Sequence, residues 1–311
     1  MNKISIIGAG MTGATAAHWL AERELADLVL VDVLEGMPQG KSLDLLQAMP
    51  IIGKDVRITG ANDYAATEGS DIIIITAGLP RKPGMSRDDL LSANAEIVGK
   101  AATETLKYSP DTIYIVLTNP LDTMAYLTMK KTGLPRERVI GQAGILDSAR
   151  MRAFVAMETG VSVENIACYV LGGHGDEMVP LTRHSNIAGI PLKEYLPADT
   201  LEAIVARTRK GGGEIVNLLK TGSAYYAPSL ACTQMAEAIL KDKHLIIPCA
   251  ACMNGEYGLN DMYFGVPVML GRKGMEKIIE YQFDDDERAM FEKSAASVKD
   301  THEALKKLLT L

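Results

Sequence analysis

Short runs of β-branched and aliphatic residues alternate with longer amphipathic stretches through the first half of the chain. The runs are continuously apolar, which is typical of strands that are buried on both faces of a parallel sheet. We predict strands at Lys3–Ile7, Leu28–Val31, Asp71–Thr76 and Ile113–Leu117, and helices at Gly10–Ala26 and Asn94–Lys107. This order of strands and helices predicts a doubly wound α/β domain.

The pattern changes after about residue 145. We predict a helix at Ser148–Thr159, strands at Asn165–Leu171, Ile246–Met253 and Val266–Leu270, and a closing helix from about Glu287. The apolar face of the closing helix is predicted to be Phe291, Ala295, Val298, Leu305 and Leu308, and Asp284, Asp285 and Asp286 precede its start. The glycine run 211–213 lacks the strand and the Lys-Ser/Thr pair of a phosphate loop. It therefore predicts a helix break.

Composition narrows the class of partner. The 311 residues carry a net charge of −7, which argues against nucleic acid or an anionic membrane as partner. No apolar run approaches the ~20 residues of a membrane helix. No signal peptide is recognised, and four cysteines form no disulfide framework, so we expect free thiols and a cytoplasmic protein. Cys249 and Cys252 lie in a predicted strand, on opposite faces, and are expected to be buried thiols rather than metal ligands.

A glycine motif follows the first strand. Its residues are Gly8, Ala9, Gly10, Met11, Thr12 and Gly13, in the spacing G-x-G-x-x-G. The motif leads into a helix whose free N–H groups favour a pyrophosphate. Asp32 ends the next strand, where a carboxylate meets the ribose hydroxyls and repels a 2′-phosphate, so NAD is favoured over NADP. The alternative is an ordinary glycine turn with a solvated aspartate.

One histidine stands out among five. His174 lies between glycines in the segment 172–176, which suits a general base that must reach a substrate. Asp147 and Arg150 are one helical turn apart, and Asp147 is the candidate that orients the histidine. The alternatives are a loop histidine without function, and a helix-capping aspartate paired with a surface arginine. The sequence leaves both open.

Polar and basic loops follow two of the buried strands. The segment 76–87 contains two prolines, two glycines and the cations Arg81, Lys82 and Arg87. Thr118 and Asn119 follow the next strand, and the carboxyl ends of parallel strands are where such sheets bind ligands. Arginines favour carboxylates because the guanidinium makes two parallel hydrogen bonds. A solvated basic loop is the alternative.

Together these segments resemble the lactate/malate dehydrogenase family over essentially the whole chain. The matching segments are 8–13, Asp32, 76–78, 81–87, 118–120, 146–150, 173–176, 255–258 and 265–267. The resemblance implies a Rossmann NAD-binding domain at residues 1–143 and an α+β substrate domain at residues 144–311. It also implies a homo-oligomer, dimer or tetramer, and a branch of bacterial enzymes that are similar to lactate dehydrogenases.

The resemblance also implies a role for each matching residue. His174 would accept the proton of the substrate hydroxyl and Asp147 would orient it. Arg150 would bind one carboxylate, Arg87 would polarise the reacting carbonyl, and Asn119 would position substrate and cofactor. Asn94, Leu117, Thr118 and Asn119 would add contacts to the cofactor. Arg81 implies a second carboxylate, hence malate rather than lactate, because members that act on lactate carry an uncharged residue there.

Three rival functions remain. The first is oxidation of lactate or another 2-hydroxy acid, against which Arg81 argues. The second is an NAD- and metal-dependent glycosidase of related fold, which needs a Cys/His metal site. Here the segment 118–120 is Thr-Asn-Pro, and Cys168 lies inside a predicted strand six residues before His174. The third is a non-catalytic NAD sensor.

Overall fold

A computed structural model describes residues 2–80 and 87–309. Its strands are β1 Lys3–Ile7, β2 Asp27–Val31, β3 Ile58–Ala61, β4 Ile72–Ile75, β5 Ile113–Val116, β6 Val139–Gly141, β7 Ile166–Ala167, β8 Val170–Leu171, β9 Val179–Pro180, β10 Asn186–Ile187, β11 Ile190–Pro191, β12 Leu245–Asn254, β13 Asn260–Gly271 and β14 Gly274–Ile278. Its helices are α1 Met11–Glu22, α2 Met37–Ala48, α3 Arg87–Tyr108, α4 Leu121–Thr132, α5 Gly144–Thr159, α6 Leu192–Tyr195, α7 Ala198–Leu219, α8 Tyr226–Leu240 and α9 Asp285–Leu309. Five short 3-10 helices are η1 Met49–Ile52, η2 Tyr64–Thr67, η3 Arg136–Arg138, η4 Val163–Asn165 and η5 Glu256–Gly258.

The predicted doubly wound sheet is present. Among the described residues, nine strands form one sheet in the order β14-β13-β12-β6-β5-β4-β1-β2-β3. The pairs from β3 to β6 are parallel and give the order 3-2-1-4-5-6, which is that of a Rossmann fold. The chain reverses direction across the sheet between β1 and β4. Crevices at such points are where ligands bind in these folds.

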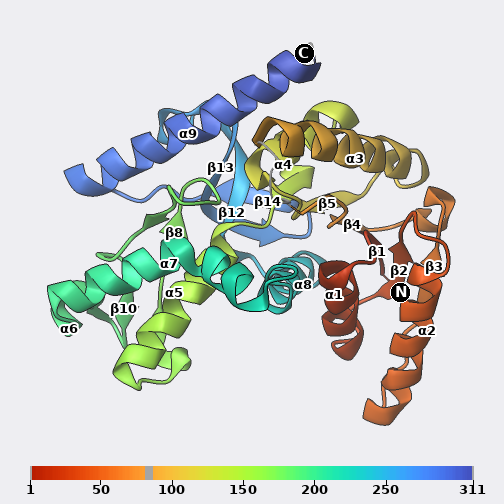
Figure 1. Cartoon of the computed structure of the whole chain (residues 1–311), viewed down its shortest axis with the longest axis horizontal. Coiled ribbons are helices and arrows are strands. Elements are labelled where there is room, and N and C mark those ends of the chain that lie inside the picture. The colour runs from red at the N-terminus through yellow and green to blue at the C-terminus, as the bar shows by residue number, and fades with distance from the viewer. Residues whose placement is uncertain (1, 81–86, 310–311) are drawn as a thin grey trace.

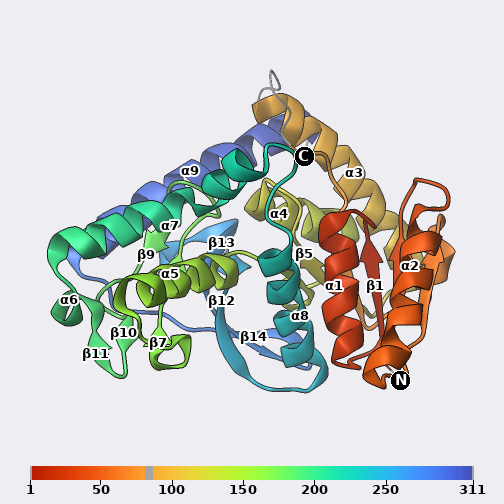
Figure 2. The same cartoon turned by 60° about the horizontal axis from the view of Figure 1, so that its bottom comes forward.

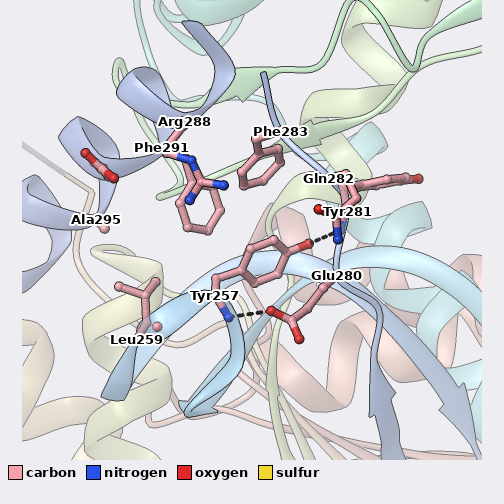
Figure 3. Close-up of a pocket in the computed structure, with 11 residues that line it drawn as sticks. Tyr257, Leu259, Glu280, Tyr281, Gln282, Phe283, Arg288, Phe291 and Ala295 are labelled. Atoms are coloured by element: carbon pink, nitrogen blue, oxygen red, sulfur yellow. Dashed lines mark hydrogen bonds between the residues drawn. The ribbon is translucent and has the colours of Figure 1, made fainter. Parts of the chain in front are cut away.

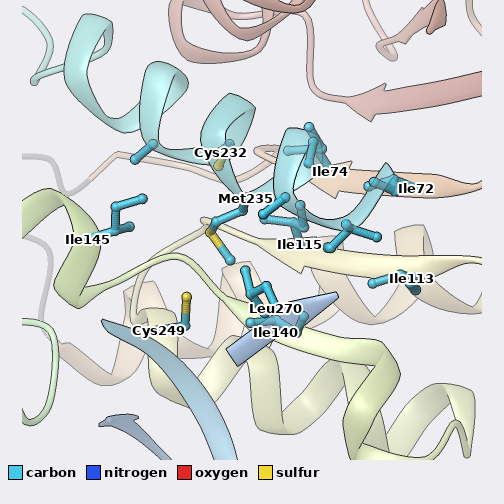
Figure 4. Packing of buried hydrophobic residues seen from close by; sticks show 14 of the residues in the cluster. Ile72, Ile74, Ile113, Ile115, Ile140, Ile145, Cys232, Met235, Cys249 and Leu270 are labelled. Atoms are coloured by element: carbon cyan, nitrogen blue, oxygen red, sulfur yellow. The ribbon is translucent and has the colours of Figure 1, made fainter. Parts of the chain in front are cut away.

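The central strands are apolar throughout because both faces of the sheet are covered. Ile72 and Ile74 of β4 face one core cluster, whereas Ile73 and Ile75 face the other. Figure 4 shows the first cluster, in which Met235 of α8 packs over the sheet. Helices α1 and α8 contribute to this cluster, and α3 and α4 contribute to the second (Figures 1 and 2).

The second half of the chain extends the sheet of the first half. Strands β12, β13 and β14 form an antiparallel ribbon, and Ala250 of β12 lies opposite Gly141 of β6. Helix α8 returns to pack on α1, where the Ser229 hydroxyl donates to the Thr12 carbonyl at 2.7 Å. The remaining short strands form two small separate sheets. Among residues 2–80 and 87–309, no helix is long and apolar enough to cross a membrane.

Several predictions about elements are wrong. Helix α3 begins at Arg87 and not at Asn94, and α5 begins at Gly144 and not at Ser148. The predicted strand Asn165–Leu171 is two short strands, β7 and β8, in different sheets, so Cys168 lies between strands and not inside one. The glycines 211–213 do not break a helix, since α7 continues through them. Helix α1 ends at Glu22, earlier than predicted, and Glu24 beyond it has a left-handed φ of 49°.

The closing helix follows its predicted face except at the end. Leu305 is buried, but Leu308 is 44% exposed. The buried positions of this helix recur at spacings of four and three. His302, which is 2% exposed, is the buried position between Val298 and Leu305. At its start, Asp284 accepts the backbone N–H of Glu287 at 2.9 Å, as expected for a carboxylate before a helix.

Candidate active site

The glycine motif forms a tight turn between β1 and α1. Gly8 has a φ of 104°, and a side chain there would lie 2.7 Å from the Ala77 amide nitrogen. A Cβ at Gly13 would lie 1.8 Å from the Gly8 carbonyl oxygen, so only glycine lets α1 start this close to the strand. In contrast, a Cβ at Gly10 would meet no atom within 4 Å. The turn therefore leaves open space beside Gly10.

The start of α1 is suited to an anion. Its first residue follows Gly10, which provides no side-chain cap, and the first turn contains no acidic residue. The N–H groups of this turn are therefore free of side-chain acceptors on the helix itself. Asp32 lies beside the turn, where its Oδ2 accepts the Ala9 N–H at 2.7 Å. The carboxylate at the end of β2 is thus next to the glycine turn, as its position in the sequence predicts.

The loops after β4 and β5 meet at the same edge of the sheet. The Thr118 hydroxyl donates to the Ala77 carbonyl at 2.7 Å. Asn94 of α3 is buried beneath both loops, where it accepts the Leu79 N–H at 2.7 Å and donates to the Asn119 carbonyl at 2.7 Å. Asn94 therefore connects the two loops, and the exposed Asn119 lies at their rim.

Asp147 contacts both His174 and Arg150. The imidazole Nδ1 of His174 lies 2.8 Å from Asp147 Oδ2, and Arg150 Nη1 donates to Asp147 Oδ1 at 2.9 Å. Asp147 is 2% exposed, so it is neither a helix cap nor part of a surface ion pair. A carboxylate accepts hydrogen bonds, so Nδ1 carries a proton and Nε2 is the nitrogen left to receive one.

Opposing effects set the proton affinity of His174. Burial works against the charged imidazolium, but the charge of Asp147 and its hydrogen bond outweigh this, so the pKa of His174 is raised above its usual 6.5. The Arg150 guanidinium lowers the same pKa, whereas the Asp122 carboxylate raises it. The site therefore favours the protonated imidazolium of His174 more than water does.

Three successive backbone amides fix the segment that carries His174. The N–H of Gly172 donates to the Gly265 carbonyl at 2.8 Å, and that of Gly173 donates to the Ser294 hydroxyl at 3.0 Å. The N–H of His174 donates to Asp122 Oδ2 at 2.9 Å. Asp122 and Ser294 are not among the site residues predicted from the sequence. No signal marks them, since an acidic residue in the first turn of a helix is usually solvated.

The glycines before His174 have a different purpose from the one predicted. A Cβ at Gly173 would lie 2.3 Å from Val298 Cγ2, and one at Gly172 would lie 2.7 Å from the Ser294 hydroxyl. They let α9 approach the segment closely. Gly175 faces open space, since a Cβ there would meet nothing within 4 Å.

Glycines of α7 also make room for Arg150. A Cβ at Gly211 would lie 3.2 Å from Arg150 Cδ, and one at Gly212 would lie 3.5 Å from its Nη2. Arg150 is 14% exposed, and its Nε is buried without a hydrogen-bond partner among the described residues. The glycine run, which the sequence predicted to break a helix, is thus the surface against which Arg150 lies.

Two predicted site residues cannot be placed. Arg81 lies outside the described residues, and of Arg87 only the backbone, as the first residue of α3, lies within them. A pocket of about 550 Å³ lies between η5, residues 280–283 and α9 (Figure 3). The Tyr257 ring crosses it, and the Tyr257 hydroxyl accepts the Tyr281 N–H at 2.9 Å. None of the described predicted site residues lines this pocket.

The predicted buried thiols are confirmed. All four cysteines are free and buried. Cys249 belongs to one core cluster and Cys252 to the other, so they lie on opposite faces of the sheet. Burial raises the pKa of Cys168 to about 12 and that of Cys252 to about 11, and such thiols are poor metal ligands and nucleophiles.

Comparison with known proteins finds one family along both parts of the chain. Residues 2–141 match the family model of the lactate/malate dehydrogenase NAD-binding domain, and residues 145–309 match that of the lactate/malate dehydrogenase α/β C-terminal domain. A malate dehydrogenase of Roseiflexus sp. (strain RS-1) is 60% identical over 304 residues, 98% of each chain. One of Bacillus subtilis is 55% identical, over 97% of this chain and 98% of the relative. The solved structure of Picrophilus torridus malate dehydrogenase in its apo form superimposes with a TM-score of 0.97, at 46% identity, covering 99% of this chain and 98% of that one.

Proposed function

This chain belongs to the lactate/malate dehydrogenase family, and from that premise we propose that it is an NAD-dependent malate dehydrogenase. It interconverts (S)-malate and oxaloacetate, an activity of the tricarboxylic acid cycle. The observation that carries the proposal is the pair of contacts made by Asp147, whose two oxygens hold His174 and Arg150 at 2.8 and 2.9 Å. One buried carboxylate thereby aligns a proton acceptor with a carboxylate-binding group.

The cofactor is NAD, and the residues at the sheet edge fit it. The open space at Gly10, the uncapped start of α1 and the Asp32 carboxylate suit a pyrophosphate and a ribose. We assign the backbone of Gly8, Ala9, Gly10, Met11, Thr12 and Gly13 to the pyrophosphate. Leu117, Thr118 and Asn119 flank the nicotinamide end, and Asn94 shapes that end by holding the loops together.

The proton and the hydride leave malate by separate routes. His174 Nε2 accepts the proton of the C2 hydroxyl, and Asp147 stabilises the resulting imidazolium through Nδ1. When bound, NAD⁺ supplies the acceptor for the hydride that leaves C2. The C2–O bond becomes a carbonyl, so the products are oxaloacetate, NADH and protonated His174. In the reverse direction, the same imidazolium returns its proton to the carbonyl oxygen.

Three arginines match the charges of the substrate. Arg150, whose Nη1 is held by Asp147, binds one carboxylate, and Arg81 binds the other. Arg87 stabilises the negative charge that develops on the carbonyl oxygen during reduction. Asn119 helps to orient the substrate.

Arg81 provides the test of the substrate assignment. In Arg81→Gln, we expect the specificity constant for oxaloacetate to fall and that for pyruvate to rise, because an arginine left without a carboxylate partner disfavours pyruvate. NADH oxidation with oxaloacetate, pyruvate and 2-oxoisocaproate on one preparation measures this. An unchanged ratio of the oxaloacetate and pyruvate constants would mean that the substrate assignment is wrong.

We also propose a homo-oligomer. Exposed apolar side chains on α1, α2 and α8 support it: Met11, Leu43 and Tyr226 are each more than half exposed. Met11 and Tyr226 line a hollow of about 450 Å³ between these helices, a surface suited to a symmetric contact with a second copy. Light scattering on a Leu43→Asp variant tests it, and an unchanged mass would contradict this face as the contact.

Location and domain boundaries are further parts of the proposal. The four free cysteines are consistent with a reducing cytoplasm. We propose an NAD-binding domain at residues 1–143 and a substrate domain at residues 144–311. Neither nucleic acid nor membrane is proposed as a partner, in keeping with the net charge of −7.

A further inference from the structure

Asp122 is a buried carboxylate that the proposed mechanism does not use. It lies in the first turn of α4 and is 6% exposed. Its Oδ2 accepts the backbone N–H of His174 at 2.9 Å, and its Oδ1 is buried without a hydrogen-bond partner among the described residues. Among the described residues, the hydrogen-bond donor that this carboxylate has on another residue is the backbone of the proposed proton acceptor.

The charge of Asp122 is what needs an explanation. An uncharged asparagine offers the same acceptor oxygen to an N–H group without the cost of burying an anion. That cost is several kcal/mol for an ion without a counter-charge. Burial accordingly raises the pKa of Asp122 to about 6, although the hydrogen bond from His174 lowers it. The N-cap position of this helix is Pro120, so Asp122 is not the capping residue.

The charges around His174 supply the explanation. Among the described residues, those facing it are Asp147 and Arg150 on α5 and Asp122 on α4. Strand β13 contributes the Gly265 carbonyl and α9 the Ser294 hydroxyl to the same segment, and both are neutral. Arg150 balances one of the two carboxylates. An imidazolium on His174 is the counter-charge for the other.

We propose that Asp122 is a positioning residue for the proton acceptor. It fixes the backbone at His174, and its buried negative charge stabilises the protonated imidazole in addition to Asp147. This inference rests on the proposed function for its catalytic consequence. The effect of the Asp122 charge on the proton affinity of His174 does not depend on the proposed reaction.

Two substitutions separate anchoring from charge. Asp122→Asn keeps the acceptor oxygen and removes the charge, whereas Asp122→Ala removes both. Asp261→Asn is the matched control, since Asp261 contacts Tyr126 and Lys130 of the same helix and does not face His174. The pH profile of oxaloacetate reduction, kcat and KM, and NADH affinity by fluorescence are measured for each variant.

We expect Asp122→Asn to move the alkaline limb of the pH profile of oxaloacetate reduction to lower pH. Without the charge of Asp122, the His174 imidazolium loses its proton more readily. The expected shift is about half a pH unit or more, and the profile of Asp261→Asn should match that of the parent. Asp122→Ala should in addition lower kcat by about tenfold, with NADH affinity unchanged, because the segment loses an anchor. A purely structural role would lower stability without moving the limb.

Nuclear magnetic resonance titration of the His174 imidazole, assigned with His174→Asn, measures the same proton affinity without substrate. A lower proton affinity of His174 in Asp122→Asn supports the inference even if the protein does not reduce oxaloacetate. Failure of the inference can therefore be distinguished from failure of the proposed function. An unchanged titration in Asp122→Asn overturns the electrostatic part whether or not Asp122→Ala folds. A kcat for folded Asp122→Ala equal to that of the parent overturns the anchoring part.

Discussion

Replacing Gly211 by alanine tests whether α7 is shaped around Arg150. The added Cβ would lie 3.2 Å from Arg150 Cδ and 3.6 Å from its Nε. The contact to Cδ is shorter than most real Cβ contacts, so the arginine side chain must shift by a few tenths of an ångström. At Gly213, two residues further along the same helix, an added Cβ would meet nothing within 4 Å. Gly213→Ala is therefore a control with the same chemical change and no contact to the site.

Both variants are expected to gain helix stability, but only Gly211→Ala is expected to bind oxaloacetate more weakly. Alanine in place of glycine in a helix interior stabilises by about 1 kcal/mol, which raises the Tm of a chain of this size by about 2 °C. Gly213→Ala should show this gain in full. In Gly211→Ala, displacing Arg150 weakens a charge-assisted hydrogen bond worth about 1.5–3 kcal/mol. Losing half of it corresponds to a KM for oxaloacetate raised by a factor of about four to twelve.

Steady-state kinetics with saturating NADH measure the KM for oxaloacetate, and calorimetry measures the Tm. We expect the KM to rise in Gly211→Ala and to stay unchanged in Gly213→Ala, with NADH affinity equal in both. If the KM of Gly211→Ala equals that of Gly213→Ala, the glycine run has no part in placing Arg150. A rise in both variants would show that helix stiffness, and not the local contact, is responsible.

Three further predictions follow from the titratable groups. His174→Asn should lower turnover by about 10³-fold and leave NADH binding intact by fluorescence titration; retained turnover would remove His174 from the mechanism. Asp147→Asn should shift the alkaline limb of oxaloacetate reduction to lower pH, because Asp147 raises the pKa of His174; a limb that does not move contradicts this role. Burial lowers the pKa of His302 to about 4, so between pH 7 and 5 the unfolded chain gains a proton that the folded chain does not, and stability falls by about 2 kcal/mol. Urea midpoints at the two pH values should differ less in His302→Gln than in the parent, and equal differences would refute the assignment.

Patterns within short stretches of the sequence predict the architecture of the N-terminal half. The apolar runs predict β1, β2, β4 and β5 to within about one residue at their C-terminal ends because these strands are covered on both faces. The glycine motif and Asp32 lie at fixed distances along the chain, so their proximity follows from one βαβ unit. The pairing of Asp147 with Arg150 is equally local, since one helical turn separates them.

The rest depends on contacts between segments that are distant in sequence. Asp122 is 52 residues from His174, and Ser294 is 121 residues from Gly173. A glycine run in a helix lowers helix propensity, and only the position of Arg150 explains why α7 keeps it. Likewise, the sequence could not show that Asn165–Leu171 divides between two sheets, because the partners of each half come from different parts of the chain.

The ribbon of β12, β13 and β14 makes the NAD-binding half a poor module for transplantation. A chain ended at residue 143 would leave β6 as an open edge, with N–H and C=O groups free to pair with another molecule. It would also lack α8, so the apolar side of α1 that packs on α8 would face water. A chimera that borrows only the first half therefore inherits a tendency to aggregate. A graft of cofactor specificity should instead exchange residues 8–32 within the intact chain, where the ribbon still closes the sheet.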